Sequence, residues 1–239
     1  MAININQVYK SVLVVLQQQK RGVLTPVEFN KVATQAQQEI FIEYFDELNQ
    51  LLRQPQTSLA YADRYALLDE KIQIFKRVES LSTSATGTVT PTTAVQELGT
   101  VVYFATSTSE GREVQRIQAY EVYTTNQSPL TKPSTFYPVY TYENNVIQLY
   151  PTTIASGTND IQLNFLKYPS DVKWGFTIDT ELGNYIYNAQ SSIDFELHQS
   201  DEPMLVDKIL GYAGVMTRDQ LALQFAAGKE QQIDIDGQK

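Results

Sequence analysis

The sequence predicts an α+β protein with an N-terminal elongated helical bundle, a central antiparallel β domain and a C-terminal helical hairpin that packs back on the bundle. Three observations predict this class. Apolar residues recur at spacings of three and four in the first 80 residues, strand-like alternation with proline punctuation follows from 101 to 197, and helical spacing returns after Ser200. The expected divisions are a bundle over 1–80, a Ser/Thr-rich linker or arm over 81–96, a β domain over 97–199, a helical hairpin over 200–228 and a polar tail over 229–239.

The longest predicted helix opens with a capping box at Thr25-Pro26-Val27-Glu28. The Thr25 hydroxyl can accept a hydrogen bond from the Glu28 N–H while the Glu28 carboxylate reaches back, and Pro26 suits the first helical position. Pro55 cannot continue a helix, so this element should end near Arg53. Between these ends lies one apolar stripe: Phe29, Val32, Ala33, Ala36, Ile40, Tyr44, Leu48, Leu51 and Leu52.

Two shorter helices complete the expected bundle. One covers about 6–19, and the other begins near Ser58. Short turns between three such helices favour an elongated bundle of antiparallel neighbours. Their apolar faces hold Val8, Val12, Val15 and Leu16 in the first, and Leu68, Ile72 and Phe75 in the second.

Residues 80–93 are rich in hydroxyl side chains. Nine of these fourteen residues are Ser or Thr, and Gly87 and Pro91 are among the rest. Hydroxyl side chains compete with backbone hydrogen bonding and bury little apolar surface. We therefore expect a linker or an extended arm between the helices and the strands.

The β region is expected to contain strands over 114–123, 146–150 and 161–165, with a tight turn at Glu143-Asn144-Asn145. Ten of the fifteen tyrosines lie between 101 and 197. Two interpretations stand for them, because a tyrosine ring serves equally in a domain's own core and at a protein interface. The candidate interface aromatics are Tyr137, Tyr140, Tyr142 and Trp174, with Trp174 interpreted as an anchor between the β part and a neighbour.

A helical hairpin is expected at the C-terminal end. Ser200 can cap its first helix, with Asp201 and Glu202 in the first turn, and Gly214 is expected to end that helix. A second capping box at Thr217-Arg218-Asp219-Gln220 would start the next helix.

This layout also fits a DNA-reading helix-turn-helix. The second helix, however, offers only Arg218 and Lys229 as cations beside Asp219 and Glu230. Major-groove readers need several donors and phosphate-neutralising cations, so a plain helical hairpin is favoured.

Composition excludes several classes of chemistry. The chain has no cysteine and one histidine, His198, so cysteine nucleophiles, disulfides, Cys/His zinc sites and iron–sulfur ligation are excluded, and any serine triad would have to use His198. The net charge is −9, of which −6 lies in residues 181–239, and a surface of that sign repels phosphate backbones. The longest apolar run near the start, 12–16, is far too short to span a membrane.

One cluster near His198 could imitate a catalytic or metal site. Asp194, Glu196 and His198 share one face if 194–198 is a strand. The favoured interpretation is a solvent-facing strand edge with Phe195 and Leu197 turned inward. The chain is therefore expected to be neither an enzyme nor a cofactor or metal carrier.

The order of the parts and several short phrases resemble a known family. Ile147-Gln148-Leu149-Tyr150-Pro151 and Asn164-Phe165-Leu166-Lys167-Tyr168-Pro169 close the β region, and the block 193–202 leads into 205–215. With the capped bundle and the Ser/Thr-rich break, these are similar to the neck and tail ring proteins (head–tail connector, adaptor) of crAss-like short-tailed phages. The resemblance covers most of the chain.

The resemblance implies a virion structural protein in the neck or tail, made and assembled in the host cytoplasm. Such a subunit joins a closed ring, typically of twelve copies, beside the portal and other ring proteins, with packaged DNA passing through the channel without sequence-specific binding. An acidic lumen would let DNA slide, because no counterion-releasing contacts would hold it. Some of the following carboxylates are expected to line that channel: Glu202, Asp207, Asp219, Asp234 and Asp236.

Two other classes remain open at this point. The chain can instead be a tail-hub or fibre-attachment module of the virion, which would form trimers or hexamers. It can also be a soluble hydrolase or a DNA-binding regulator, which would remain a monomer or dimer with its own activity.

Overall fold

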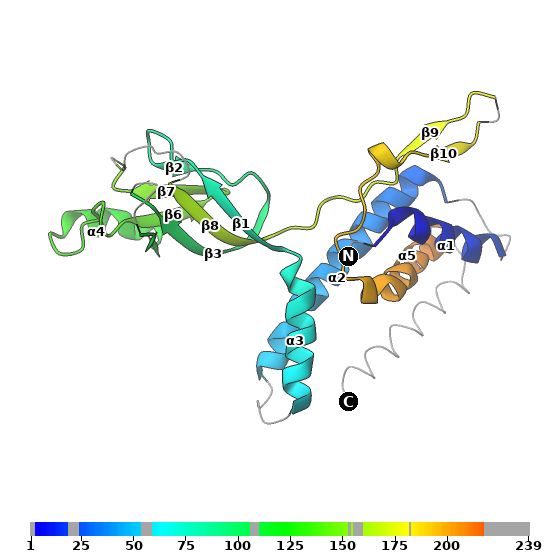
Figure 1. Cartoon of the computed structure of the whole chain (residues 1–239), viewed down its shortest axis with the longest axis horizontal. Coiled ribbons are helices and arrows are strands. Elements are labelled where there is room, and N and C mark those ends of the chain that lie inside the picture. Colours follow the sequence, from blue (N-terminus) through cyan, green and yellow to red (C-terminus); the bar gives the residue numbers. More distant parts are fainter. Residues whose placement is uncertain are drawn as a thin grey trace. The chain divides into compact units, whose positions relative to one another are not determined.

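The computed structural model describes residues 3–18, 24–53, 59–105, 110–152, 154, 160–181 and 183–217. It confirms the α+β class and divides the chain into two compact units (Figure 1). The helical unit consists of Met1–Ile74 together with Pro169–Lys239, and the sheet unit is Phe75–Tyr168. The sheet unit is therefore an insertion between two stretches of chain that fold together.

The helical unit contains α1 (Ile5–Gln18), α2 (Pro26–Arg53), α3 (Leu59–Gln73) and α5 (Glu202–Thr217). The starts and ends of α1 and α2 and the start of α3 agree with the predictions to within a residue or two, but Phe75, expected on the face of the third helix, lies beyond its end. Helix α5 packs on α2 and on α1, and α3 packs on α2. The expected apolar stripes are mostly buried, but Val15 and Leu52 are 40% and 54% exposed because each lies beside the stripe at its helix end.

The capping box at the start of α2 is confirmed. The Thr25 backbone N–H donates to Glu28 Oε2 at 2.9 Å, and the Glu28 N–H donates to Thr25 Oγ1 at 3.4 Å. The side-chain and backbone hydrogen bonds from Thr25 hold the pKa of Glu28 below its ordinary value. Two N–H groups that the helix itself cannot satisfy are thus paired at a partly exposed site.

The C-terminal part differs from the prediction in two ways. Gly214 does not end a helix: α5 continues to Thr217, since the buried packing of its apolar face outweighs the cost of glycine inside a helix. The cap is His198 rather than Ser200, because a 3-10 turn (Gln199–Asp201) precedes α5 and places Ser200 within it. The expected second helix of the hairpin and the polar tail lie outside the described residues.

Two β-sheets build the sheet unit. One has the order β1-β8-β3-β4, formed by β1 (Lys76–Leu81), β8 (Ile161–Lys167), β3 (Val95–Tyr103) and β4 (Arg112–Glu113). The other has the order β2-β7-β6-β5, formed by β2 (Thr88–Val89), β7 (Val146–Tyr150), β6 (Val139–Glu143) and β5 (Gln115–Arg116). The expected antiparallel pairing holds for every pair of these strands except β5 with β6, which is parallel.

One apolar core joins the two sheets. Strand β8 alternates buried and half-buried residues along its length, as the sequence predicts for a strand with one covered face. Ile161 and Leu163 of β8 and Ile147 and Leu149 of β7 are fully buried in the same cluster. The tight turn is confirmed too: Asn144 and Asn145, between β6 and β7, have φ angles of 50° and 61°, as a two-residue hairpin loop with the strand twist requires.

The Ser/Thr-rich segment is not a linker or an arm. It contains the end of β1 and all of β2, and several of its polar groups make hydrogen bonds within the sheet unit. The Thr83 N–H donates to Asp160 Oδ1 at 2.7 Å, and the Thr92 hydroxyl donates to Glu79 Oε1 at 2.6 Å. Gly87, at a φ of 76°, makes the turn into β2, where an added Cβ would lie 3.1 Å from the Leu149 carbonyl oxygen. The Thr92 and Thr93 hydroxyls thus donate to the Glu79 carboxylate, and those of Ser84, Thr86 and Thr88 pair with one another.

The expected domain boundaries shift accordingly. The sheet unit begins at Phe75 and ends at Tyr168, whereas residues 169–199 fold with the helices. There they form a two-stranded hairpin of β9 (Phe176–Ile178) and β10 (Tyr185–Tyr187) and a 3-10 turn (Ala189–Ser191). The predicted strand over 114–123 is also wrong in its second half, where a 3-10 turn (Ala119–Glu121) leads into α4 (Val122–Gln127). The Glu121 carboxylate accepts from the Gln118 N–H at 3.1 Å and so starts this helix.

We predict that replacing Thr25 with alanine lowers the free energy of unfolding of the helical unit by about 1 kcal/mol, because the two hydrogen bonds of its hydroxyl, one from the Glu28 N–H and one to the Glu28 carboxylate, are lost. Trp174, the only tryptophan, lies in this unit, so its fluorescence during urea unfolding reports the change. Gln38→Ala, at an exposed position of α2, is the matched control and should change stability little. An equal effect of both substitutions would contradict the capping role.

Candidate functional site

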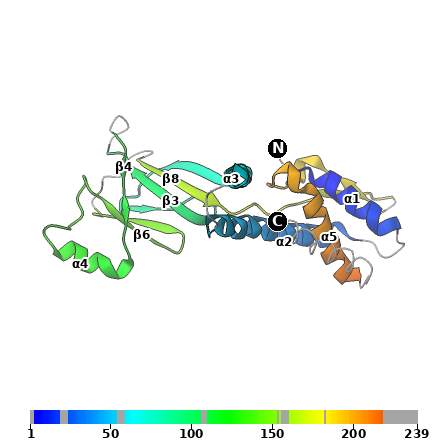
Figure 2. The same ribbon diagram turned by 90° about the horizontal axis from the view of Figure 1, so that it is seen from below.

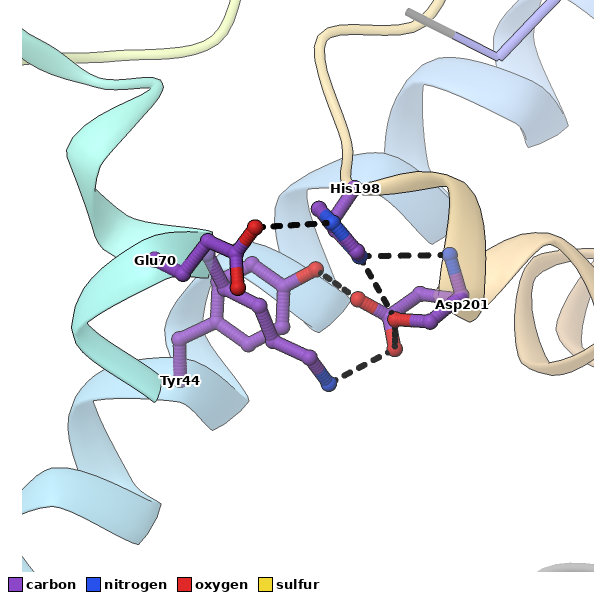
Figure 3. Close-up of polar contacts among 6 residues, drawn as sticks. Tyr44, Glu70, His198 and Asp201 are labelled. Carbon is purple, nitrogen blue, oxygen red and sulfur yellow. Dashed lines mark hydrogen bonds and ion pairs between the residues drawn. The ribbon is translucent and has the colours of Figure 1, made fainter. Parts of the chain in front are cut away.

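The polar side chains of the helical unit gather around Asp201 (Figure 3). Asp201 is 6% exposed and lies in the 3-10 turn before α5. The Tyr44 hydroxyl of α2 donates to its Oδ2 at 2.5 Å, and the Lys71 ammonium of α3 donates to its Oδ1 at 2.7 Å. The Lys71 Nζ also stands 5.4 Å from the centroid of the Tyr44 ring. One carboxylate therefore ties together three helices of this unit.

The electrostatics of this cluster follow from burial. Burial, then the hydrogen bond and the negative charge of Asp201, raise the pKa of Tyr44 far above its ordinary value. The phenol therefore stays protonated and remains a donor to Asp201 at every physiological pH. A buried carboxylate is tolerated only when charge and hydrogen bonds compensate it, and here Lys71 and Tyr44 supply both.

His198 serves as the cap of the turn that holds Asp201. Its Nδ1 accepts a hydrogen bond from the Ser200 backbone N–H at 3.3 Å and lies 2.7 Å from Ser200 Oγ. Its Nε2 lies 3.9 Å from the Glu70 carboxylate of α3. Ser200, His198 and Glu70 lie near one another, as the members of a catalytic triad do. His198 and Ser200, however, are two residues apart in the sequence, and their contact belongs to the cap of the 3-10 turn. Capping of the turn is therefore enough to explain where these side chains lie, and no catalytic role is needed to explain it.

The other members of the expected His198 cluster have separate structural roles. Asp194 Oδ1 accepts from the Ile5 N–H at 2.9 Å at the start of α1, and the Glu196 carboxylate accepts from the Ser170 N–H at 3.1 Å. Residues 194–198 do not form the expected strand, because Phe195 makes only an isolated bridge with Ile3, but Phe195 and Leu197 are fully buried, as expected for the inward face. Across the part of the chain that the structure describes, no group of three or more acidic or histidine side chains could hold a metal ion.

Two of the four candidate interface aromatics are core residues, which corrects the expectation for them. Trp174 is 4% exposed, donates from Nε1 to Asn6 Oδ1 at 3.2 Å, and packs 4.5 Å from the Tyr9 ring within the helical unit. Tyr140 is equally buried in the core of the sheet unit. Tyr142 is half-buried, and only Tyr137 is widely exposed, at 82%. Sequence alone could not separate these cases, because all four rings have similar polar and apolar parts.

An aromatic arm, residues 117–138, leaves the sheet unit between β5 and β6. It carries α4, which lies apart from both sheets in Figure 2 and has no buried residue. Leu130 is 97% exposed. The other large apolar side chains exposed on this arm are Tyr120, Tyr123, Phe136 and Tyr137. The sequence carried a signal for it, because Tyr120 and Tyr123 stand three apart behind the capping pattern of Gln118 and Glu121.

The helical unit displays a second apolar projection, the β9–β10 hairpin (Figure 1). The pair Ile178 and Tyr185 stands on one face, and Ile186 stands on the other, and all three are about half exposed. The base of the hairpin is anchored by Trp174, whose ring stacks 6.1 Å from Phe176. A two-stranded hairpin with both faces in water is marginal by itself, so a partner surface would stabilise it.

A groove of about 490 Å³ lies beside the arm in the sheet unit. Its walls are four residues of β3 (Leu98, Gly99, Thr100, Val101), the stretch from Glu113 to Arg116, and Tyr140. A neighbouring hollow of about 420 Å³ is lined by Arg112, Glu113, Phe136 and Tyr137. The Arg112 guanidinium stands 4.6 Å from the Phe136 ring, so the cation is presented on an aromatic face.

The structure describes two of the five candidate channel carboxylates. Glu202 and Asp207 lie on α5, five residues apart, and therefore point about 140° apart around the helix axis. Asp219, Asp234 and Asp236 lie outside the described residues.

The chain matches no protein-family model and no curated protein sequence. Within the described ranges, no helix is both long enough and apolar enough to cross a lipid bilayer. The exposed apolar projections and the groove are thus the features that bear most directly on function.

We predict that Asp201→Asn lowers the free energy of unfolding of the helical unit by about 2–3 kcal/mol, because Lys71 loses its buried partner charge. Urea unfolding followed by Trp174 fluorescence measures the change. The control is Asp46→Asn, at an exposed position of α2, which should stay within about 0.5 kcal/mol of the parent. If Asp201→Asn behaves like Asp46→Asn, the cluster does not hold the helices together.

We also predict that the helical unit loses stability above pH 10. Tyr44 and, by burial, Tyr9 have raised pKa values in the folded unit, so the unfolded chain releases these protons first. Stability from the neutral phenols is complete below the unfolded pKa of about 10 and falls as the pH rises further. Unfolding measured between about pH 9 and pH 11 should show the fall, and Tyr44→Phe should make it shallower. An identical pH dependence in this variant would rule out Tyr44 as a source.

Proposed function

We propose that this chain is a structural subunit of an oligomeric ring in the head–tail connector or tail of a tailed phage. There it joins the portal to the tail and forms part of the DNA channel. The observation that carries the proposal is the pair of exposed apolar projections, the aromatic arm and the β9–β10 hairpin. The order of the parts and the short sequence motifs, which resemble those of neck and tail ring proteins, suggest which assembly this is.

Exposed apolar groups of this size favour contact with other protein. Burying one large apolar side chain contributes about 1.5–3 kcal/mol, so burial of the five large side chains of the arm would offset much of the cost of association. A monomer rarely keeps such a patch in water. The role of these residues is therefore contact rather than catalysis.

The distribution of the patches favours a ring over a simple dimer. A twofold dimer needs one self-complementary patch, whereas a closed ring needs two different patches that meet head to tail. The arm and the hairpin are different in shape and belong to different units of the chain. The engagement of His198 in a helix cap is consistent with a non-enzymatic role.

The proposal is tested in the virion. A reconstruction of particles that carry this chain should place it in a ring between the head and the tail, and twelve copies of 27.1 kDa would form a ring of about 325 kDa. Threefold or sixfold placement at a tail hub or fibre base, or absence from purified particles, would overturn it.

The arm supplies a second test. We predict that the double substitution Phe136→Ser and Tyr137→Ser strongly reduces incorporation into particles and leaves the unfolding of the purified chain nearly unchanged, since both side chains are exposed. Val78→Ser is the control, because Val78 is equally exposed but lies on β1, outside the arm. Normal incorporation of the double variant would show that the arm is not a subunit contact.

A further inference from the structure

The groove of the sheet unit runs along an unpaired strand edge. Strand β3 pairs with β8 from Val95 to Tyr103, but with β4 only at Val102 and Tyr103. In the described part of this sheet no strand pairs with β3 on the β4 side before Val102. The free edge covers Leu98 to Thr100, because the Val101 carbonyl oxygen already accepts from the Val114 N–H at 2.8 Å, and these three residues line the groove. An extended peptide can add to such an edge through its backbone hydrogen bonds.

The side chains of the groove favour an apolar and acidic peptide. Leu98 and Tyr140 supply apolar wall, and Arg116 stands at the rim with its guanidinium 5.8 Å from the Tyr142 ring. Arg112 lines the adjoining hollow. Against these two cations the linings of both hollows contain one carboxylate, Glu113. Arginine pairs well with carboxylates in two-pronged hydrogen bonds, so acidic side chains are the natural partners.

The chain contains a segment with that pattern near its C-terminus. Ile233-Asp234-Ile235-Asp236 alternates apolar and acidic residues with the period of a strand. Added to a sheet edge, it would turn both isoleucines to one side and both aspartates to the other. Ile233 lies sixteen positions after Thr217, the last residue of α5, so the segment can reach at most about 55 Å from that helix.

We propose that the groove binds the 233–236 segment of a second copy of this chain as an added strand on the free edge of β3. The isoleucines contact the apolar wall, and Asp234 and Asp236 pair with Arg116 and Arg112. The inference rests on the proposed ring, in which copies stand side by side, and it names one contact that joins them. Each copy gives its C-terminal segment to one neighbour and receives that of another, which is the head-to-tail connection that a closed ring requires.

Cysteine cross-linking tests the contact directly, because the chain contains no cysteine of its own. Full-length Thr100→Cys is mixed with full-length Ile233→Cys or Ile235→Cys, each partner carrying a different tag, and disulfides are formed with a mild oxidant. We expect a dimer that contains both tags. Val78→Cys is the control acceptor, because Val78 is exposed on β1 at the opposite edge of the same sheet. A similar yield for Thr100→Cys and Val78→Cys would overturn the proposal.

Charge variants give the second readout. Asp234→Asn with Asp236→Asn, or Arg112→Gln with Arg116→Gln, should each lower the Thr100→Cys yield several-fold, and added salt should do the same. None of these substitutions removes a buried side chain among the described residues, so circular dichroism should show an intact fold. Unchanged yields would overturn the pairing of aspartate with arginine. A link that forms only inside one chain carrying both cysteines would overturn the exchange between copies.

The outcome is separate from that of the proposed function. Cross-linking is measured on purified chains, and the ring is sought in particles. If a ring is found in the virion but the cross-link does not form, only the contact of the 233–236 segment is overturned. If the specific cross-link forms but the chain is absent from particles, the contact stands and the assignment to a phage ring is overturned.

Discussion

The helical unit forms by the packing of two stretches of chain that are far apart in the sequence, and the carboxylate of Asp201 binds side chains across that packing. Its partners Tyr44 and Lys71 precede the inserted sheet unit, and Asp201 follows it. A buried charge without such partners would destabilise the fold by several kcal/mol. The cluster therefore favours the one arrangement in which α2, α3 and the start of α5 meet.

Other long-range polar contacts repeat this design. Gln37, fully buried in α2, donates to the Ser170 carbonyl oxygen at 2.8 Å and accepts from the Glu196 N–H at 2.9 Å. Asn30 of α2 likewise accepts from the Trp174 N–H at 2.7 Å. The irregular chain after the sheet unit thus receives from helix side chains the hydrogen bonds that a strand would receive from a neighbour. Outside the β9–β10 hairpin, these contacts hold it in place.

Each unit combines a closed core with an apolar projection. In the helical unit Trp174 connects the two, because its ring packs on Tyr9 inside and on Phe176 at the base of the β9–β10 hairpin. In the sheet unit the aromatic arm leaves between two strands of one sheet, and neither its 3-10 turn nor α4 contains a buried residue. A rigid base that presents apolar side chains lowers the entropy lost on binding, which is what the proposed contact with other subunits would require.

The amino-acid sequence predicted the local structure, but it did not predict which distant residues contact one another. The capping box at Thr25, the ends of α1 and α2, the alternation of β8 and the Asn144–Asn145 turn each depend on residues within a few positions of one another, so their pattern predicts them. The Ser/Thr-rich segment folds into the sheet unit because Asp160 and Glu79 accept its hydrogen bonds. Trp174 is buried because it packs on Tyr9 and donates to Asn6. The sheet unit ends at Tyr168 because the chain then returns to α2. Such pairings join residues 13 to 168 positions apart. Only the tertiary structure decides them, because hydrogen-bond capacity and apolar area are properties of a side chain, while the partner that satisfies them is a property of the fold.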